Sequence, residues 1–126
     1  MTDVLVVDSE SGFRRLVRRW VETQGLDAVE AQTATEALAV AVRSTPKVVV
    51  CDVHLARGEN GWWLAREMRR LYPRTVVIMT TAHHQFDAER GHLVGVTTFL
   101  IKPFLPEQLL AALHAALIEH AARRKT

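Results

Sequence analysis

The apolar positions of this chain gather in short continuous runs that are rich in β-branched residues. Four such runs are Val4–Val7, Val48–Cys51, Val76–Thr80 and Thr97–Ile101. Runs of this length, separated by helix-length segments, are typical of strands buried on both faces of a parallel sheet. A weaker run, Asp27–Glu30, supplies a fifth strand. The pattern therefore predicts an α/β fold around a five-stranded parallel sheet.

The segments between these runs carry apolar residues at helical spacing. We predict helices over residues 11–24, 33–44, 61–72, 85–92 and 106–123. The second helix begins at a capping box, Thr33–Glu36, and the last follows Pro106, which suits a first helical turn. The predicted buried stripe of the first helix is Phe13, Leu16, Val17, Trp20 and Val21, and that of the last is Leu109, Leu110, Leu113, Leu117 and Ala121.

A polar residue stands at the end of each of the four strong runs, namely Asp8, Asp52, Thr81 and Lys102. In an open α/β sheet the carboxyl ends of the strands form the ligand-binding edge. Two carboxylates, a hydroxyl and an ammonium at one edge suit a metal-assisted phosphoryl transfer to a carboxylate. The alternative is that each is an ordinary strand terminus, with Asp8 or Ser9 capping the first helix.

Length and composition fit one domain covering residues 1–126. Apolar residues make up 48% of the chain and charged residues 24%, as in ordinary globular proteins. The net charge of +2 is too small to imply nucleic-acid binding. No apolar stretch approaches the roughly 20 residues that span a bilayer, and the first strand begins too early for a signal peptide. A single cysteine, Cys51, excludes an intramolecular disulfide and fits a reducing cytoplasm.

Four short motifs occur in a characteristic order and spacing: VLVVDSE at Val4–Glu10, Asp52–Leu55, Thr81–Ala82 and Lys102–Phe104. Together they resemble the receiver domain of two-component response regulators, the CheY-like superfamily. The resemblance implies a flavodoxin-like, doubly wound (βα)5 fold with strand order 2-1-3-4-5. It also implies a signalling phosphoprotein of a phosphorelay rather than an enzyme.

The resemblance assigns a role to each matching residue. Asp52 would accept the phosphoryl group from a histidine kinase or phosphotransfer protein. Asp8, Asp52 and the backbone carbonyl of His54 would hold Mg²⁺, while Lys102, the Thr81 hydroxyl and the Ala82 N–H would bind phosphoryl oxygens. The Lys102–Pro103 bond is expected to be cis.

Three positions depart from the family pattern. Ser9 stands where receivers carry a second metal-binding acid, so we expect weaker Mg²⁺ binding, with Glu10 either replacing that acid or serving the helix N-terminus. The loop after Asp52 has Ala56 in place of the usual proline and is about one residue longer. Phe99 occupies the switch position, where receivers commonly have a tyrosine or another aromatic residue. It would still rotate inward as Thr81 moves, but it has no hydroxyl to bond at the surface.

The resemblance also implies an output face, and it leaves alternative functions open. The output face would comprise the fourth helix, the fifth strand and the last helix, used for partner binding or homodimerisation. Since no DNA-binding motif follows, the chain is either a stand-alone receiver or a receiver from a longer protein. A pseudo-receiver, acting unphosphorylated because of Ser9, stays open, whereas a nucleotide-binding enzyme lacks the expected glycine-rich loop.

Surface features suggest further contacts. Trp63 is predicted to be exposed, either as an interface residue or lying along its own helix. The first helix displays Arg14, Arg15, Arg18 and Arg19, a solvated face or a docking surface for the kinase. His54 and His83 flank the predicted cleft, and a transition-metal site there is the less favoured reading. His114 and His120 are predicted at the surface.

Overall fold

The computed structural model describes residues 1–55, 60–82, 91, 94–96 and 98–123. Its strands are β1 (Val4–Val7), β2 (Ala28–Ala31), β3 (Val48–Asp52), β4 (Val76–Ala82) and β5 (Thr98–Lys102). Its helices are α1 (Ser11–Glu22), α2 (Ala34–Ser44), α3 (Gly61–Leu71) and α5 (Pro106–Arg123). The strands form one parallel sheet in the order β2-β1-β3-β4-β5. This is the predicted fold class and strand order.

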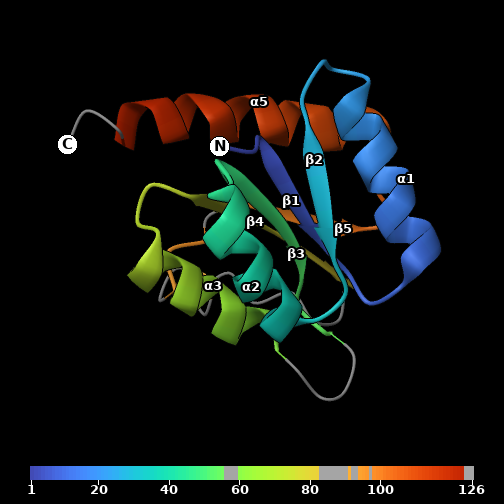
Figure 1. The fold of residues 1–126 in the computed structure, drawn as a ribbon. Coiled ribbons are helices and arrows are strands. Elements are labelled where there is room, and N and C mark those ends of the chain that lie inside the picture. Colours follow the sequence, from blue (N-terminus) through green and yellow to red (C-terminus); the bar gives the residue numbers. More distant parts are fainter. Residues whose placement is uncertain (56–59, 83–90, 92–93, 97, 124–126) are drawn as a thin grey trace.

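The sheet is sandwiched between two layers of helices (Figure 1). Successive strand residues face opposite layers, so Val4 and Val6 pack with α1 and α5, whereas Leu5 and Val7 pack with α2 and α3. Both faces of the central strands are therefore covered, which explains why their sequences are continuously apolar rather than alternating.

The element bounds differ from the predicted ones by a residue or two. Strand β2 lies one residue later than predicted, and β4 and β5 extend to Ala82 and Lys102. Helix α1 ends at Glu22 rather than Gln24, and Gly25 follows with a positive φ of 75°. The predicted helix over residues 85–92 lies outside the described residues except for Gly91.

Two predicted buried stripes need correction. Leu16 is 41% exposed, so α1 buries mainly Val17 and Val21. On α5 the buried residues are Leu109, Leu113, Ala116 and His120. A spacing of four, three and four residues follows the helical period, and it selects His120 rather than Ala121, which is exposed. The prediction of a surface position was thus wrong for His120, although His114 is exposed as expected.

Polar residues just before α1, α2 and α3 cap these three helices. The Thr33 hydroxyl accepts a hydrogen bond from the Glu36 N–H, as the capping box predicts. Helix α1, however, is capped by Glu10, so neither Asp8 nor Ser9 fills that role. None of the described helices is long and apolar enough to cross a membrane.

Candidate functional site

Three of the predicted site residues meet at the carboxyl edge of the sheet. Asp8 follows β1, while Asp52 and Lys102 are the last residues of β3 and β5. The Lys102 Nζ lies 2.8 Å from Asp8 Oδ2 and 2.9 Å from Asp52 Oδ2. Strand β4 separates β3 from β5, and the long lysine side chain spans that distance. The Lys102–Pro103 bond is cis, as expected.

The Lys102 ammonium is mostly buried and lies between two carboxylates. The Lys102 side chain is 27% exposed, and the Asp8 side chain only 4%. Burial by itself would lower the pKa of the Lys102 ammonium, but its hydrogen bonds to Asp8 and Asp52 outweigh burial and raise that pKa above its ordinary value. Lys102 is therefore positively charged at any physiological pH and offsets one of the two carboxylates.

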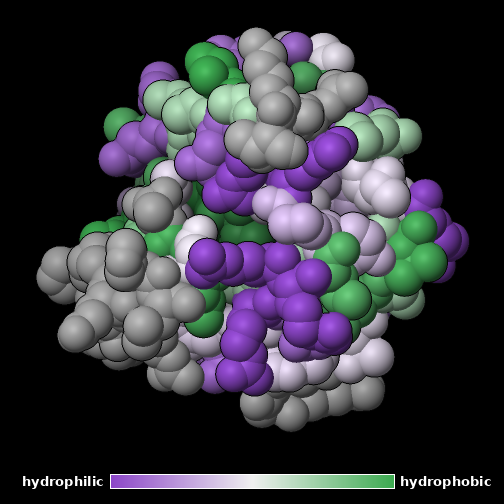
Figure 2. All heavy atoms as spheres, turned by 90° about the vertical axis from the view of Figure 1, so that its left-hand side faces the viewer, coloured by the Kyte–Doolittle hydropathy of each residue, from purple (hydrophilic) through white to green (hydrophobic). Residues whose placement is uncertain are grey.

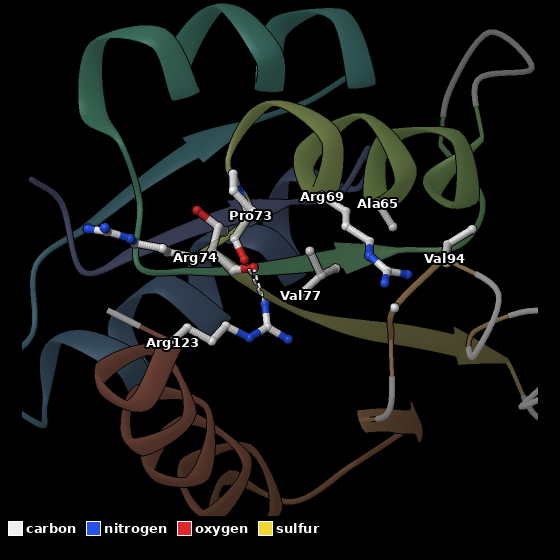
Figure 3. Close-up of a pocket in the computed structure, with 9 residues that line it drawn as sticks. Ala65, Arg69, Pro73, Arg74, Val77, Val94 and Arg123 are labelled. Atoms are coloured by element: carbon white, nitrogen blue, oxygen red, sulfur yellow. Dashed lines mark hydrogen bonds between the residues drawn. The ribbon is translucent and has the colours of Figure 1, made fainter. Parts of the chain in front are cut away.

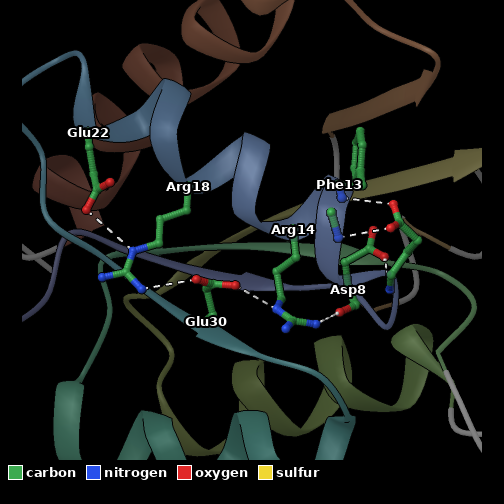
Figure 4. Close-up of polar contacts among 8 residues, drawn as sticks. Asp8, Phe13, Arg14, Arg18, Glu22 and Glu30 are labelled. Atoms are coloured by element: carbon green, nitrogen blue, oxygen red, sulfur yellow. Dashed lines mark hydrogen bonds and ion pairs between the residues drawn. The ribbon is translucent and has the colours of Figure 1, made fainter.

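Backbone donors fix the two carboxylates from the other side. Asp8 Oδ1 accepts a hydrogen bond from the Glu10 N–H at 2.9 Å, and Asp52 Oδ1 accepts one from the His54 N–H at 3.3 Å. The Arg14 guanidinium donates to the Asp8 carbonyl at 2.8 Å (Figure 4). Each carboxylate thus has one oxygen on the backbone and one on the lysine, which fixes its orientation.

Thr81 and Ala82 end the strand that lies between Asp52 and Lys102. Asp52 pairs with Thr80 in the sheet register, so Thr81 lies one residue beyond it, and Ala82 pairs with Lys102. The Thr81 side chain is fully buried, and its hydroxyl donates to the Ala82 carbonyl at 3.1 Å. The predicted hydroxyl is therefore at the correct strand end, although it bonds to its own strand here.

Glu10 has a structural role that the sequence left open. Its two carboxylate oxygens accept hydrogen bonds from the Gly12 N–H at 2.9 Å and the Phe13 N–H at 2.8 Å. Both oxygens cap α1, which is the second of the two roles that the sequence allowed for Glu10. Among the described residues, no three of the histidines, cysteines and acids group together as a metal site. His83 lies outside the described residues.

Phe13 is a site neighbour that the sequence predicted only as a core residue. Its ring lies beneath the Lys102 ammonium, with Nζ 4.4 Å from the ring centroid. The ring of Phe104 meets it edge-on, with centroids 5.5 Å apart. The signal in the sequence was its place in the first turn of the helix that follows Asp8.

The predicted switch residue Phe99 is partly buried and packs against the ring of Trp62, with centroids 5.9 Å apart. Gly91 leaves room for it, because a Cβ there would lie 2.3 Å from Phe99 Cζ.

Trp63 is 40% exposed, as predicted. Cys51 is fully buried, and burial together with Asp52 and Asp8 raises the pKa of its thiol, which fits an inert core residue.

Two of the four arginines on the basic face of α1 form ion pairs within the molecule. Arg14 Nε lies 2.7 Å from Glu30 Oε1, and Arg18 Nη1 lies 3.1 Å from Glu30 Oε2 (Figure 4). Arg18 also pairs with Glu22 at 3.4 Å. Burial would raise the pKa of the Glu30 carboxyl, but the hydrogen bonds from both arginines outweigh it and lower that pKa. Two of the four arginines thus join α1 to β2.

A cavity of about 610 Å³ lies at the opposite end of the sheet from Asp52. Its lining includes Thr75, which precedes β4, together with Arg69 and Arg123 on either side of Val77 (Figure 3). The Arg123 guanidinium donates to the Thr75 carbonyl at 2.9 Å. Seen from the side where α5 ends, the centre of the surface is hydrophilic (Figure 2). This cavity is separate from the acidic cluster, which is formed by Asp8, Asp52 and Lys102, and none of the predicted site residues lines it.

Comparison with known proteins identifies the family of the chain. The sequence profile of the response regulator receiver domain matches residues 4–114. The KDP operon transcriptional regulatory protein KdpE of Escherichia coli K12 is 30% identical over 97% of this chain and 54% of its own length. The phosphate regulon transcriptional regulatory protein PhoB of Pseudomonas aeruginosa is 34% identical over 90% of this chain and 51% of its own. The chain spans about half the length of these curated relatives.

Solved structures give the same result for the fold. The chemotaxis response regulator CheY4 of Vibrio cholerae superposes with a TM-score of 0.83 and 31% identity, covering 93% of this chain and 99% of that one. The receiver domain of NtrX from Brucella abortus gives 0.84 and 29%, covering 92% and 98%. The chain belongs to the response regulator receiver domain family. It is a signalling domain of the two-component type.

Proposed function

We propose that the chain is a phosphoacceptor receiver in which Asp52 takes a phosphoryl group from a histidine kinase or a phosphotransfer protein. The observation that carries this proposal is the convergence of Asp8, Asp52 and Lys102 at the carboxyl edge of the sheet. A carboxylate is a weak nucleophile, so the reaction depends on a good donor, positioning and neutralisation of charge.

In the proposed step, a carboxylate oxygen of Asp52 forms a bond to phosphorus as the bond to the imidazole nitrogen of the donor phosphohistidine breaks. Lys102 then transfers one of its hydrogen bonds from the Asp52 carboxylate to a phosphoryl oxygen. The Thr81 hydroxyl and the Ala82 N–H bond the other phosphoryl oxygens. The Thr81 hydroxyl leaves the Ala82 carbonyl in doing so, which gives the switch its first movement.

A bound Mg²⁺ would neutralise charge between Asp52 and the incoming phosphoryl group. The donors present suit it, since the Asp8 and Asp52 carboxylates and the His54 carbonyl are all hard oxygen ligands. Their number is small, however. Ser9 has no carboxylate and Glu10 is committed to the α1 cap, so we expect Mg²⁺ to bind more weakly than in a receiver with two adjacent acids.

The proposed output follows from the packing around Phe99. Movement of Thr81 toward the phosphoryl group would let Phe99 turn inward from its position against Trp62. We expect this movement to rearrange the face that includes β5 and α5, which would bind a partner or a second copy of the chain. Phe99 lacks a hydroxyl, so its two positions differ in packing alone.

A pseudo-receiver is the second candidate function. The observation in its favour is the missing second acid of the metal site: Ser9 stands in its place, and the Glu10 carboxylate, which could replace it, caps α1. In that case the domain would bind its partner without phosphorylation.

Phosphoryl incorporation from acetyl phosphate, with and without Mg²⁺, distinguishes the two candidates. We expect the wild type to gain one phosphoryl group, measured by intact mass, and hydroxylamine to remove it as it does an acyl phosphate. Asp52→Asn should gain none, whereas Asp8→Asn keeps the acceptor and should react more slowly. A folded wild type that gains no phosphoryl group at any Mg²⁺ concentration would establish the pseudo-receiver instead.

A further inference from the structure

The Lys102 ammonium has an aromatic neighbour in addition to its two carboxylates. It lies over the Phe13 ring at 4.4 Å from the centroid, within the range of a cation–π interaction. Phe13 belongs to α1, whereas Lys102 ends β5, so this contact joins two elements that the sheet does not connect.

The position of the Phe13 ring is fixed from two sides. Its backbone N–H donates to Glu10 Oε2, which places the residue in the capped first turn of α1. Its ring is packed edge-on against Phe104, at an interplanar angle of 81°. Phe104 comes two residues after Lys102, so a single short segment supplies both the ammonium and the ring that holds Phe13 in place.

An aromatic face differs from a third carboxylate or a water molecule in how it holds a cation. It attracts the charge through its quadrupole but takes no N–H in a directional hydrogen bond. An ammonium has three N–H donors, and two of them bond Asp8 and Asp52. The Phe13 face therefore confines Lys102 while leaving its donors for oxygen atoms.

We propose that Phe13 is a positioning residue for phosphoryl transfer, acting through Lys102 by holding the ammonium at the cleft with its donors available. This inference rests on the proposed function of the same site. Its consequence is that the first turn of α1, including the Glu10 cap, sets the position of the lysine that meets the phosphoryl group.

The test compares Phe13→Leu, which keeps apolar volume but removes the aromatic face, with Phe13→Tyr, which keeps the face. Trp20→Leu is the matched control, because Trp20 also contacts Phe104, at 6.3 Å between centroids, and lies on the same helix. Two quantities are measured for each folded variant: the proton chemical shift of the Lys102 ε-methylene and the rate of phosphoryl incorporation from acetyl phosphate.

We expect the Phe13 ring current to shift the Lys102 ε-methylene upfield in the wild type, in Phe13→Tyr and in Trp20→Leu, but not in Phe13→Leu. Phe13→Leu should slow incorporation about two- to fivefold, the range of a partly exposed cation–π contact. The other two variants should react at the wild-type rate. In the background of Lys102→Met, Phe13→Leu should have no additional effect on the residual rate.

Two results would overturn the proposal: equal rates for wild type and Phe13→Leu, or an equal loss in Trp20→Leu, which would trace the effect to general packing. Failure of the proposed function has a different signature. In that case the wild type itself takes up no phosphoryl group, and Phe13 has no phosphoryl transfer to assist. The chemical shift of the Lys102 ε-methylene still reports whether the contact between Phe13 and Lys102 exists.

Discussion

Two acids only two positions apart, Asp8 and Glu10, serve different purposes at the start of α1. The Asp8 carboxylate bonds Lys102 at the carboxyl edge of the sheet, and the Glu10 carboxylate turns back to cap α1. Ser9, between them, contributes no charge. The electrostatic character of the site is thus set by which of three consecutive side chains carries an acid and where each one points.

At this scale we predict that Ser9→Asp tightens Mg²⁺ binding by about tenfold, because a third carboxylate beside Asp8 adds a hard oxygen ligand and a negative charge. Isothermal titration with MgCl₂ measures this. Ser11→Asp is the control, since it adds the same charge two residues later at the exposed start of α1. Equal Mg²⁺ affinities for wild type and Ser9→Asp would show that position 9 is not part of the metal site.

At the scale of elements, Glu30 holds α1 against β2. Its side chain is 21% exposed and bonds two arginines one helical turn apart. Helix α1 exposes Leu16 and buries mainly two valines, so these ion pairs supplement a narrow apolar contact. They also explain why half of the arginine face is not free to meet a partner.

We predict that Glu30→Gln lowers the free energy of unfolding by about 1 kcal/mol at about pH 7. The native pKa of Glu30 is lowered, so its stabilisation is present above the unfolded-state pKa and is lost as the pH falls through the native one. The difference between the two proteins should therefore shrink as the pH falls below about 4.3, the unperturbed pKa of glutamate, and disappear below the lowered native pKa. Urea unfolding at several pH values measures it.

Glu22→Gln is the matched control for that experiment. Among the residues that the structure describes, Glu22 pairs with Arg18 alone, at 3.4 Å, and its side chain is 46% exposed. Its replacement should change stability by less than about 0.5 kcal/mol. If the two variants were equally stable at every pH, the pairing of Glu30 with both arginines would stabilise the protein no more than the single exposed pair of Glu22 does.

Helix α5 is attached to the loop between α3 and β4 by two side chains of its last turns. His120 Nδ1 lies 2.9 Å from the Arg74 carbonyl, and Arg123 donates to the Pro73 and Thr75 carbonyls. These contacts bring the end of α5 to the edge of the sheet opposite Asp52. The proposed output helix is thus fixed at its C-terminal end.

At the scale of the whole molecule, Lys102 joins the two halves of the sheet. Its two ion pairs connect β5, at one edge, to β1 and β3. We predict that Lys102→Met lowers the free energy of unfolding by about 2 kcal/mol at about pH 7, because it leaves the buried Asp8 carboxylate without its counterion.

Lys47→Met provides the comparison for this prediction. Lys47 pairs with Asp3 at 3.2 Å, with the lysine side chain 33% exposed, so its loss should cost less than about 1 kcal/mol. Equal denaturation midpoints for Lys102→Met and the wild type would contradict the view that the acidic cluster depends on the lysine for its stability.

The sequence predicted those parts of the molecule whose signals are local. A β-branched run followed by Asp52 or Lys102 marks both a buried strand and its carboxyl end, so the sheet and the edge where the site lies were both predictable. The contact of Phe13 with Lys102 was not, because it depends on how α1 lies across the sheet. His120 was misplaced because an alanine at 121 fits an apolar stripe by composition, whereas helical geometry decides between the two.

Of the described strands, β2 lies at an edge of the sheet and pairs with β1 alone. An edge strand offers unpaired backbone groups to which another chain can add a strand, and charged side chains oppose that addition. Glu30, with Arg14 and Arg18 bound to it, places charge of both signs on this four-residue strand. The charged side chains that fasten α1 to β2 thereby also oppose the addition of a strand from another chain at this edge.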